Sequence, residues 1–203
     1  MCIRDRAMTD RVVAHRGAAC WATLFTHSHY LPCLAALLQS MRACQTRYPL
    51  VVMVTETVDA RTRERLTRMG CVLRDVDAWR VPHADGSLAF ERFQNVWTKL
   101  RAFELYEYER VVMIDSDMLM CHNMDELFDR PLERGMIAAA LACTCNPKQI
   151  PTYPAEWTPR NCGYALRPHP PNDTRQLTKP THRLINSCLL YTSPSPRDAT
   201  LSR

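Results

Sequence analysis

Two aspartates in the middle of the 203-residue chain, Asp115 and Asp117, directly follow the apolar run Val111–Ile114. A continuous run of this kind is typical of a strand that is buried on both faces of a sheet. On an extended chain, side chains two positions apart point the same way, so the two carboxylates should lie together. At about 4 Å they would repel each other by roughly 4 kcal/mol at an effective dielectric near 20. The pair therefore predicts a bound cation.

The ligand chemistry of this acidic turn narrows the choice of cation. Ligands that are all oxygen suit Mn²⁺ or Mg²⁺, which keep part of their hydration shell and bridge to substrate phosphates. In α/β proteins, ligands bind at the carboxyl ends of the strands. We therefore predict a metal–diphosphate site here, and we include the intervening Ser116 among its ligand-binding residues.

The elements that would position this site alternate between strand and helix. Apolar runs predict strands at 21–25, 50–55, 72–76, 111–114 and 136–143. Helical spacing, an N-capping Asp59 and a terminating Gly70 predict helices at 31–47, 59–69 and 94–108. Loops are expected at 82–87 and 146–179. This order predicts an α/β fold with a doubly wound sheet and helices on both of its faces.

Composition excludes several classes of partner. The net charge is +5, but no basic stripe with interleaved aromatic residues is present, so nucleic acid is not expected. No run of eighteen apolar residues and no signal-peptide pattern occurs, so we expect no membrane span.

Ten cysteines raise the question of disulfides or a metal. Most lie scattered among apolar neighbours, as reduced cysteines do in cytosolic proteins, and this favours a cytoplasmic location. Cys143, Cys145 and Cys162 could form part of a zinc site. Their spacing lacks a Cys-x-x-Cys pair and a clear fourth ligand, so the sequence favours packing or loop cysteines.

Both ends of the chain resemble translated sequencing adapters, namely MCIRDR at 1–6 and CLLYTSPSPRDATLSR at 188–203. The alternative is a pair of natural tails. On the adapter interpretation, 7–187 is a partial domain without its native ends. We then expect 188–203 to be disordered or to make no native packing, and the chain of 203 residues to be inactive.

Taken in order, five motifs make the chain resemble glycosyltransferase family 8, the group of glycogenin and galactinol synthase. They cover about 20–187 and read ATLFTHSHYLPCLAALLQSMR at 22–42, YPLVVMVTETV at 48–58, RMGCVLRDVD at 68–77, WTKLRAFELYEYERVVMIDSDMLMCHNMDELFD at 97–129 and LINS at 184–187. The Gly-Cys-Val-Leu-Arg and Ala-Cys-Thr-Cys segments are closer to galactinol synthase than to glycogenin.

The resemblance implies a GT-A fold, a UDP-sugar donor, Mn²⁺ or Mg²⁺ as cofactor, and transfer of a hexose with retention at the anomeric carbon. By position it assigns the metal to Asp115 and Asp117. Lys99 matches a lysine that contacts the donor, with an exposed helix charge as the alternative. The implied acceptor is a hydroxyl group of inositol, a sugar or a protein tyrosine. The catalytic carboxylate, the donor sugar and the oligomeric state stay open.

Further positions are carried over to the nucleotide and the sugar. Those near the uridine are Leu24, Thr26 and Tyr30, and those that begin the turn lining the sugar pocket are Asn186 and Ser187. Ordinary packing is the alternative for the tyrosine. His27 stands where the family often has Asn. We interpret His122 as a loop residue and the segment 123–126 as the cap of a following helix.

Two other classes of function are compatible with parts of this pattern. A non-catalytic binding protein could retain the fold, although the intact acidic pair and Lys99 argue against it. A haloacid-dehalogenase-like phosphatase also places Asp-x-Asp after an apolar strand. That class is disfavoured because Met118 and Leu119 do not fit its motif.

Overall fold

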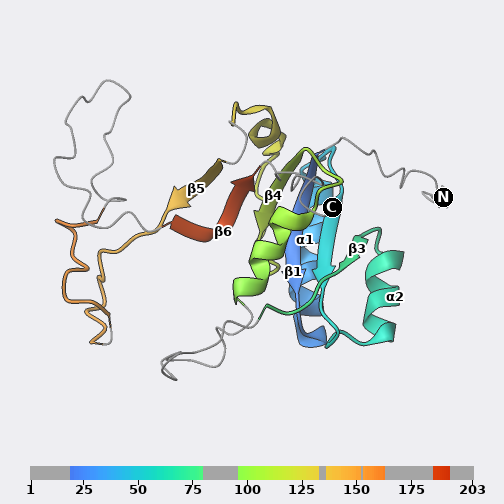
Figure 1. The fold of residues 1–203 in the computed structure, drawn as a ribbon, viewed down its shortest axis with the longest axis horizontal. Helices are drawn as coiled ribbons and strands as arrows, with labels where there is room; N and C mark the ends of the chain where they lie inside the picture. Colours follow the sequence, from blue (N-terminus) through green and yellow to red (C-terminus); the bar gives the residue numbers. More distant parts are fainter. Residues whose placement is uncertain (1–18, 80–95, 133–135, 152, 163–184, 193–203) are drawn as a thin grey trace, which may run out of the picture.

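The fold is built on one six-stranded sheet (Figure 1). In this computed structural model the described residues are 19–79, 96–132, 136–151, 153–162 and 185–192, the last of these by backbone alone. The strands are β1 Ala19–Phe25, β2 Leu50–Val54, β3 Val72–Asp75, β4 Arg110–Ile114, β5 Ile137–Leu141 and β6 Ile185–Thr192. Their order across the sheet is β3-β2-β1-β4-β6-β5. The predicted α/β class and doubly wound sheet are confirmed.

The direction of the strands decides where a site can form. β1 pairs in parallel with β2 and with β4, and β2 pairs in parallel with β3. β6 is antiparallel to both of its neighbours, β4 and β5. The carboxyl ends of β1 to β5 therefore share one edge of the sheet, and the amino end of β6 lies at that same edge.

Apolar side chains pack on both faces of the central strands β1, β2 and β4, whose residues are nearly all buried, whereas β3 and β5 are partly or fully exposed. Trp21, Val52 and Val112 belong to one apolar cluster, which also contains the buried leucines of helices α1 (Leu31–Ala43) and α2 (Ala60–Arg68). The residues next to them along each strand, such as Ala22, Val51 and Met113, belong to a second cluster on the other face. Ala102 of the 3-10 helix η3 (Val96–Glu104) packs in that cluster. This alternation follows from the two-residue period of a strand.

The helices differ from prediction mainly at their ends. Helix α1 stops at Ala43, because the chain turns at Gln45 with φ of 54°. Helix α2 begins as predicted, since the Asp59 carboxylate accepts a hydrogen bond from the Thr62 amide at 2.8 Å. Gly70 follows its end with φ of 86°, a conformation that glycine adopts without strain. The helix expected at 94–108 is the shorter η3.

The expectation that 188–203 is disordered is wrong for the first five of these residues, and the expectation that they make no native packing stays a prediction. Cys188–Thr192 form most of β6, and their backbone pairs with β4 from Leu189 opposite Ile114 to Thr192 opposite Val111. The run Leu-Leu-Tyr-Thr has high strand propensity, and the edge of β4 offers unpaired backbone groups, so this pairing is favourable whatever the origin of the residues.

Several expectations lie outside the described residues, among them the loop at 82–87 and most of 163–187. The described part of the expected irregular loop, 146–162 without residue 152, consists of turns. Among the described residues, no helix is both long and apolar enough to cross a bilayer.

Candidate functional site

The acidic turn lies where β4 ends, at the shared carboxyl edge of the sheet. Asp115 is half-buried and Asp117 is exposed. The backbone is not extended here as predicted, because the Met118 amide donates to the Asp115 carbonyl at 3.2 Å and closes a turn. Strand alternation therefore does not set the relative direction of the two carboxylates.

Lys99 contacts the acidic turn directly. Its Nζ donates to Oδ1 of Asp115 at 2.6 Å, and the two side chains are only 21% and 18% exposed. The lysine is therefore not a solvated charge on the helix surface, which was the alternative at the sequence level. The pair neutralises one of the two carboxylates and leaves Asp117 as the exposed negative group.

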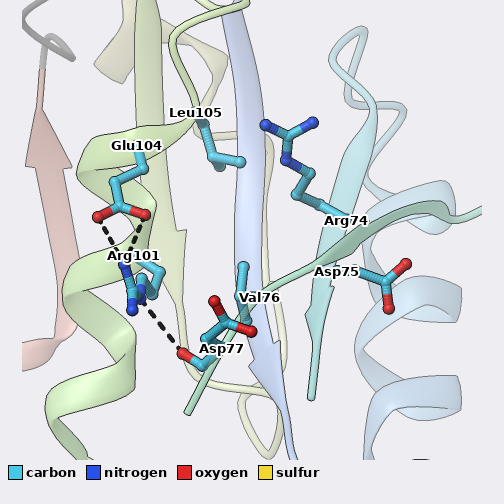
Figure 2. A pocket seen from close by; sticks show the side chains of 7 residues that line it. All are labelled: Arg74, Asp75, Val76, Asp77, Arg101, Glu104 and Leu105. Atoms are coloured by element: carbon cyan, nitrogen blue, oxygen red, sulfur yellow. Dashed lines mark hydrogen bonds and ion pairs between the residues drawn. The ribbon is translucent and has the colours of Figure 1, made fainter. Parts of the chain in front are cut away.

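Contacts on either side of Lys99 hold η3 against the end of β3 (Figure 2). The Arg101 guanidinium donates to both oxygens of Glu104, at 2.7 and 2.9 Å, and to the Asp77 carbonyl at 3.2 Å. These residues line a pocket of about 110 Å³. One residue before Lys99, the Thr98 hydroxyl accepts a hydrogen bond from the Trp79 amide at 3.0 Å. These hydrogen bonds hold η3, and with it Lys99, against the segment that follows β3.

The segment after β1 emerges at the same edge. Leu24 is half-buried against the second apolar cluster, and the Thr26 carbonyl accepts a hydrogen bond from the Thr57 hydroxyl at 2.5 Å. Tyr30 ends the short helix η1 (Ser28–Tyr30) and is 40% exposed, so packing does not account for it. Its ring lies 4.2 Å from that of His29, centroid to centroid. The residues predicted to bind uridine therefore lie at or after the end of β1, the strand that pairs with β4, and the exposed ring of Tyr30 is one of them.

Asn186 and Ser187 belong to the amino end of β6. The register pairs Leu189 with Ile114, the last residue of β4. Because β6 is antiparallel, the residues before Leu189 continue past the end of β4 toward the acidic turn. The backbone places both residues at this edge, and their role in binding the sugar stays a prediction.

The sequence did not indicate how much Asp125 contributes to the structure. It is 4% exposed, and it accepts hydrogen bonds from the Thr46 hydroxyl and from the Arg47 amide, the latter at 2.9 Å. Burial raises the pKa of this carboxyl, but the hydrogen bonds from Thr46, Arg47 and Asn123 outweigh burial and hold the pKa below its ordinary value.

The predicted capping by segment 123–126 comes only from Asn123, because the N-cap residue Met124 makes no side-chain hydrogen bond to the helix. The Asn123 side chain accepts a hydrogen bond at 2.8 Å from the Asp125 amide, at the start of the 3-10 helix η4 (Asp125–Asp129). His122 is exposed in the preceding loop, as interpreted from the sequence. This loop is thus fastened to the end of α1 and is not part of the acidic turn.

Comparison with curated proteins identifies relatives over much of the chain, although no family model matches it. Galactinol synthase 5 of Arabidopsis thaliana is 30% identical over 147 residues, which is 71% of this chain and 44% of that protein. Galactinol synthase 2 of Ajuga reptans is 34% identical over 109 residues, or 54% of this chain and 37% of that protein. The chain is a galactinol synthase-like member of glycosyltransferase family 8. It spans less than half the length of these relatives.

Solved structures confirm the GT-A fold of this galactinol synthase-like chain. The bifunctional glycosyltransferase WbbM matches with a TM-score of 0.57 at 17% identity, over 88% of this chain and 32% of that one. The galactosyltransferase LgtC, solved with donor and acceptor sugar analogues, matches with a TM-score of 0.57 at 14% identity, over 85% of this chain and 57% of that one. These likenesses give no support to the phosphatase alternative.

Proposed function

We propose that the protein is a retaining glycosyltransferase that moves a hexose from a UDP-sugar to a hydroxyl acceptor with the help of Mn²⁺ or Mg²⁺. The observation that carries this proposal is the acidic turn at the end of β4 with Lys99 bound to Asp115, in a galactinol synthase-like chain with a GT-A fold.

The residues of the turn fit a hard divalent cation. Asp115 and Asp117 offer only oxygen ligands, and with Lys99 they leave the turn one negative charge in excess. Asp117 is exposed, so its carboxylate is open to an ion from solvent. When bound, the cation would neutralise the charge that develops on the departing diphosphate.

Lys99 has a second task in this proposal. Its ammonium group has three donors, of which the structure shows one on Asp115. If a UDP-sugar binds at the turn, the other two N–H groups of the ammonium can donate hydrogen bonds to its phosphate oxygens. The lysine would then neutralise the Asp115 carboxylate before the UDP-sugar binds and would hold the diphosphate afterwards.

Residues at the neighbouring strand ends would hold the rest of the donor. We assign the uridine to Leu24, Thr26 and the exposed ring of Tyr30, and the sugar to the turn that begins at Asn186 and Ser187. The relatives are named as synthases of galactinol, so inositol is the first acceptor to test, ahead of a sugar or a protein tyrosine.

The deciding experiment measures binding of UDP by calorimetry with and without Mn²⁺. We expect Asp115→Ala and Asp117→Ala to abolish Mn²⁺-dependent binding while the far-ultraviolet circular dichroism is unchanged. Asp129→Ala, an exposed aspartate at the end of η4, is the matched control and should bind normally. Unchanged UDP affinity in both turn variants would contradict the proposal.

Two finer statements accompany this proposal. We propose that the 203-residue chain alone lacks transfer activity, since it spans only 44% of the length of galactinol synthase 5. Release of UDP from a UDP-sugar by this chain would contradict that statement. UDP-sugar binding without hydrolysis or transfer, by a chain extended to the length of its relatives, would instead favour the non-catalytic alternative. We also propose a cytoplasmic location, because the cysteines are scattered among apolar neighbours in the sequence, as reduced cysteines are in cytosolic proteins.

A further inference from the structure

Three cysteines that are far apart in sequence converge beyond the end of β5. The Sγ atoms of Cys143, Cys145 and Cys162 all lie within 4.8 Å of one another. Within the described ranges, this is the one group of three or more His, Cys, Asp or Glu side chains close enough to share an ion. The sequence favoured packing or loop cysteines here, because their spacing lacks a Cys-x-x-Cys pair and a clear fourth ligand.

The segment between these cysteines has little else to hold it. Neither apolar cluster includes a described residue from 142–162, and within that part only Thr144 and Cys162 are buried. Several of its backbone hydrogen bonds are local, as in the Gln149 amide on the Asn146 carbonyl at 2.9 Å and the Trp157 amide on the Pro154 carbonyl at 3.0 Å, and Cys162 adds an isolated β-bridge at its end. A long segment without a core of its own needs a tertiary link to repay the entropy of ordering it.

We propose that Cys143, Cys145 and Cys162 bind one zinc ion as thiolates and that this ion fastens the segment 143–162. Zinc–sulfur bonds of about 2.3 Å in a tetrahedron place the sulfur atoms about 3.8 Å apart. The observed separations of at most 4.8 Å therefore need to close by no more than about 1 Å.

The surroundings of the group fit this ion. Three sulfur ligands favour zinc over Mn²⁺ or Mg²⁺, so the group would not compete with the acidic turn for its cation. The Thr144 amide donates to Cys162 Sγ at 3.2 Å, and such outer hydrogen bonds orient and stabilise metal-bound thiolates. Each thiol releases its proton to solvent as the ion binds, and the fourth coordination position is open to water or to another residue of the chain.

The position of the group gives it a structural consequence at the candidate site. β5 and β4 are both antiparallel to β6, so the segment after β5 leaves the sheet at the edge that holds the acidic turn. Zinc would thus fix the segment that leaves the sheet at that edge. This inference rests on the cysteine geometry and is independent of the proposed transferase activity.

The first test is the metal content of the 203-residue chain purified under reducing conditions with zinc in the growth medium. We expect about one zinc per chain, and loss of the metal in Cys143→Ser. Cys121→Ser is the matched control, because both cysteines are exposed and only Cys143 belongs to the group. Equal zinc content in the two variants, or no zinc in the unaltered chain, would overturn the proposal.

The second test does not depend on a variant that must fold. Lys148 and Arg160 are exposed trypsin sites inside the segment. We expect cleavage at both to accelerate at least tenfold when a chelator removes zinc, and added zinc alone to restore protection. Equal cleavage rates with and without zinc would overturn the proposal. So would a mass spectrum that shows a disulfide between any two of the three cysteines in chain isolated with its thiols blocked at lysis.

Discussion

Replacing Lys99 with Met should change two affinities of the acidic turn in opposite directions. The Nζ–Oδ1 contact of 2.6 Å to Asp115 joins two side chains that are about four-fifths buried. The gross attraction at that distance is about 6 kcal/mol at an effective dielectric near 20. Desolvation and side-chain entropy offset most of it, so we expect a net contribution of about 1–2 kcal/mol.

That magnitude sets the expected results. Without the lysine, a cation no longer displaces a bound ammonium group, so Mn²⁺ alone should bind about 5- to 30-fold more tightly. Mn²⁺ together with UDP should bind more weakly, because a charge-assisted hydrogen bond to phosphate, about 1.5–3 kcal/mol, is lost. The melting temperature should fall by about 2–8 °C.

The assay is a calorimetric titration with Mn²⁺ alone and then with UDP at saturating Mn²⁺. Lys99→Arg retains the charge and should fall between the parent and Lys99→Met in both affinities. Arg68→Met, at an exposed arginine that ends α2, should leave both unchanged. A parallel loss of both affinities in Lys99→Met would refute the competition between ammonium and metal.

The remaining predictions concern stability. Asp125→Ala should lower the free energy of unfolding by about 2–4 kcal/mol in urea denaturation, because it leaves buried donors without an acceptor, whereas Asp129→Ala should change it by less than about 0.5 kcal/mol. Gly70→Ala should lower the free energy of unfolding by about 1 kcal/mol, because alanine is strained at a φ of 86°. The added Cβ would meet only an ordinary contact at 3.4 Å, so no clash adds to this cost. An unchanged urea midpoint would argue against this backbone conformation. Hydrogen bonds from Ser28 and Thr62 lower the pKa of Asp59 from 3.8 to about 2. The ionised carboxylate therefore stabilises the fold fully above about pH 4, and this stabilisation is lost as the pH falls through about 2. The melting temperature of Asp59→Asn should depend less on pH in that window than the melting temperature of the parent.

Much of the sheet could be predicted because it depends on local pattern. Continuous apolar runs located β1, β2 and β4 to within two residues, and Asp59 and Gly70 located the ends of α2. These features need only neighbouring residues, so the sequence contains them. The shortening of α1 was missed because a positive φ at Gln45 has no clear sequence signal.

The parts of the candidate site that depend on distant contacts could not be predicted. The bond between Lys99 and Asp115 requires η3 to be held by Arg101 and Asp77, which periodicity does not show. The convergence of Cys162 on Cys143 depends on the path of a long turn-rich segment. The resemblance of residues 188–192 to an adapter led us to expect no structure there, although their ability to pair as a strand depends on the open edge of β4.

The place of β6 between β4 and β5 has a consequence for the order of folding. In the described part of the chain β5 pairs with β6 alone, yet β6 begins at Ile185, far behind the end of β5 at Leu141. During synthesis, β1 to β4 can pair as soon as they leave the ribosome, whereas β5 has no partner strand until β6 has been synthesised. Contacts of such long sequence separation form slowly. This order of synthesis predicts a stage in which β1 to β4 form a four-stranded sheet while the edge of β4 is open and β5 is unpaired, and such an open edge is where another strand would add.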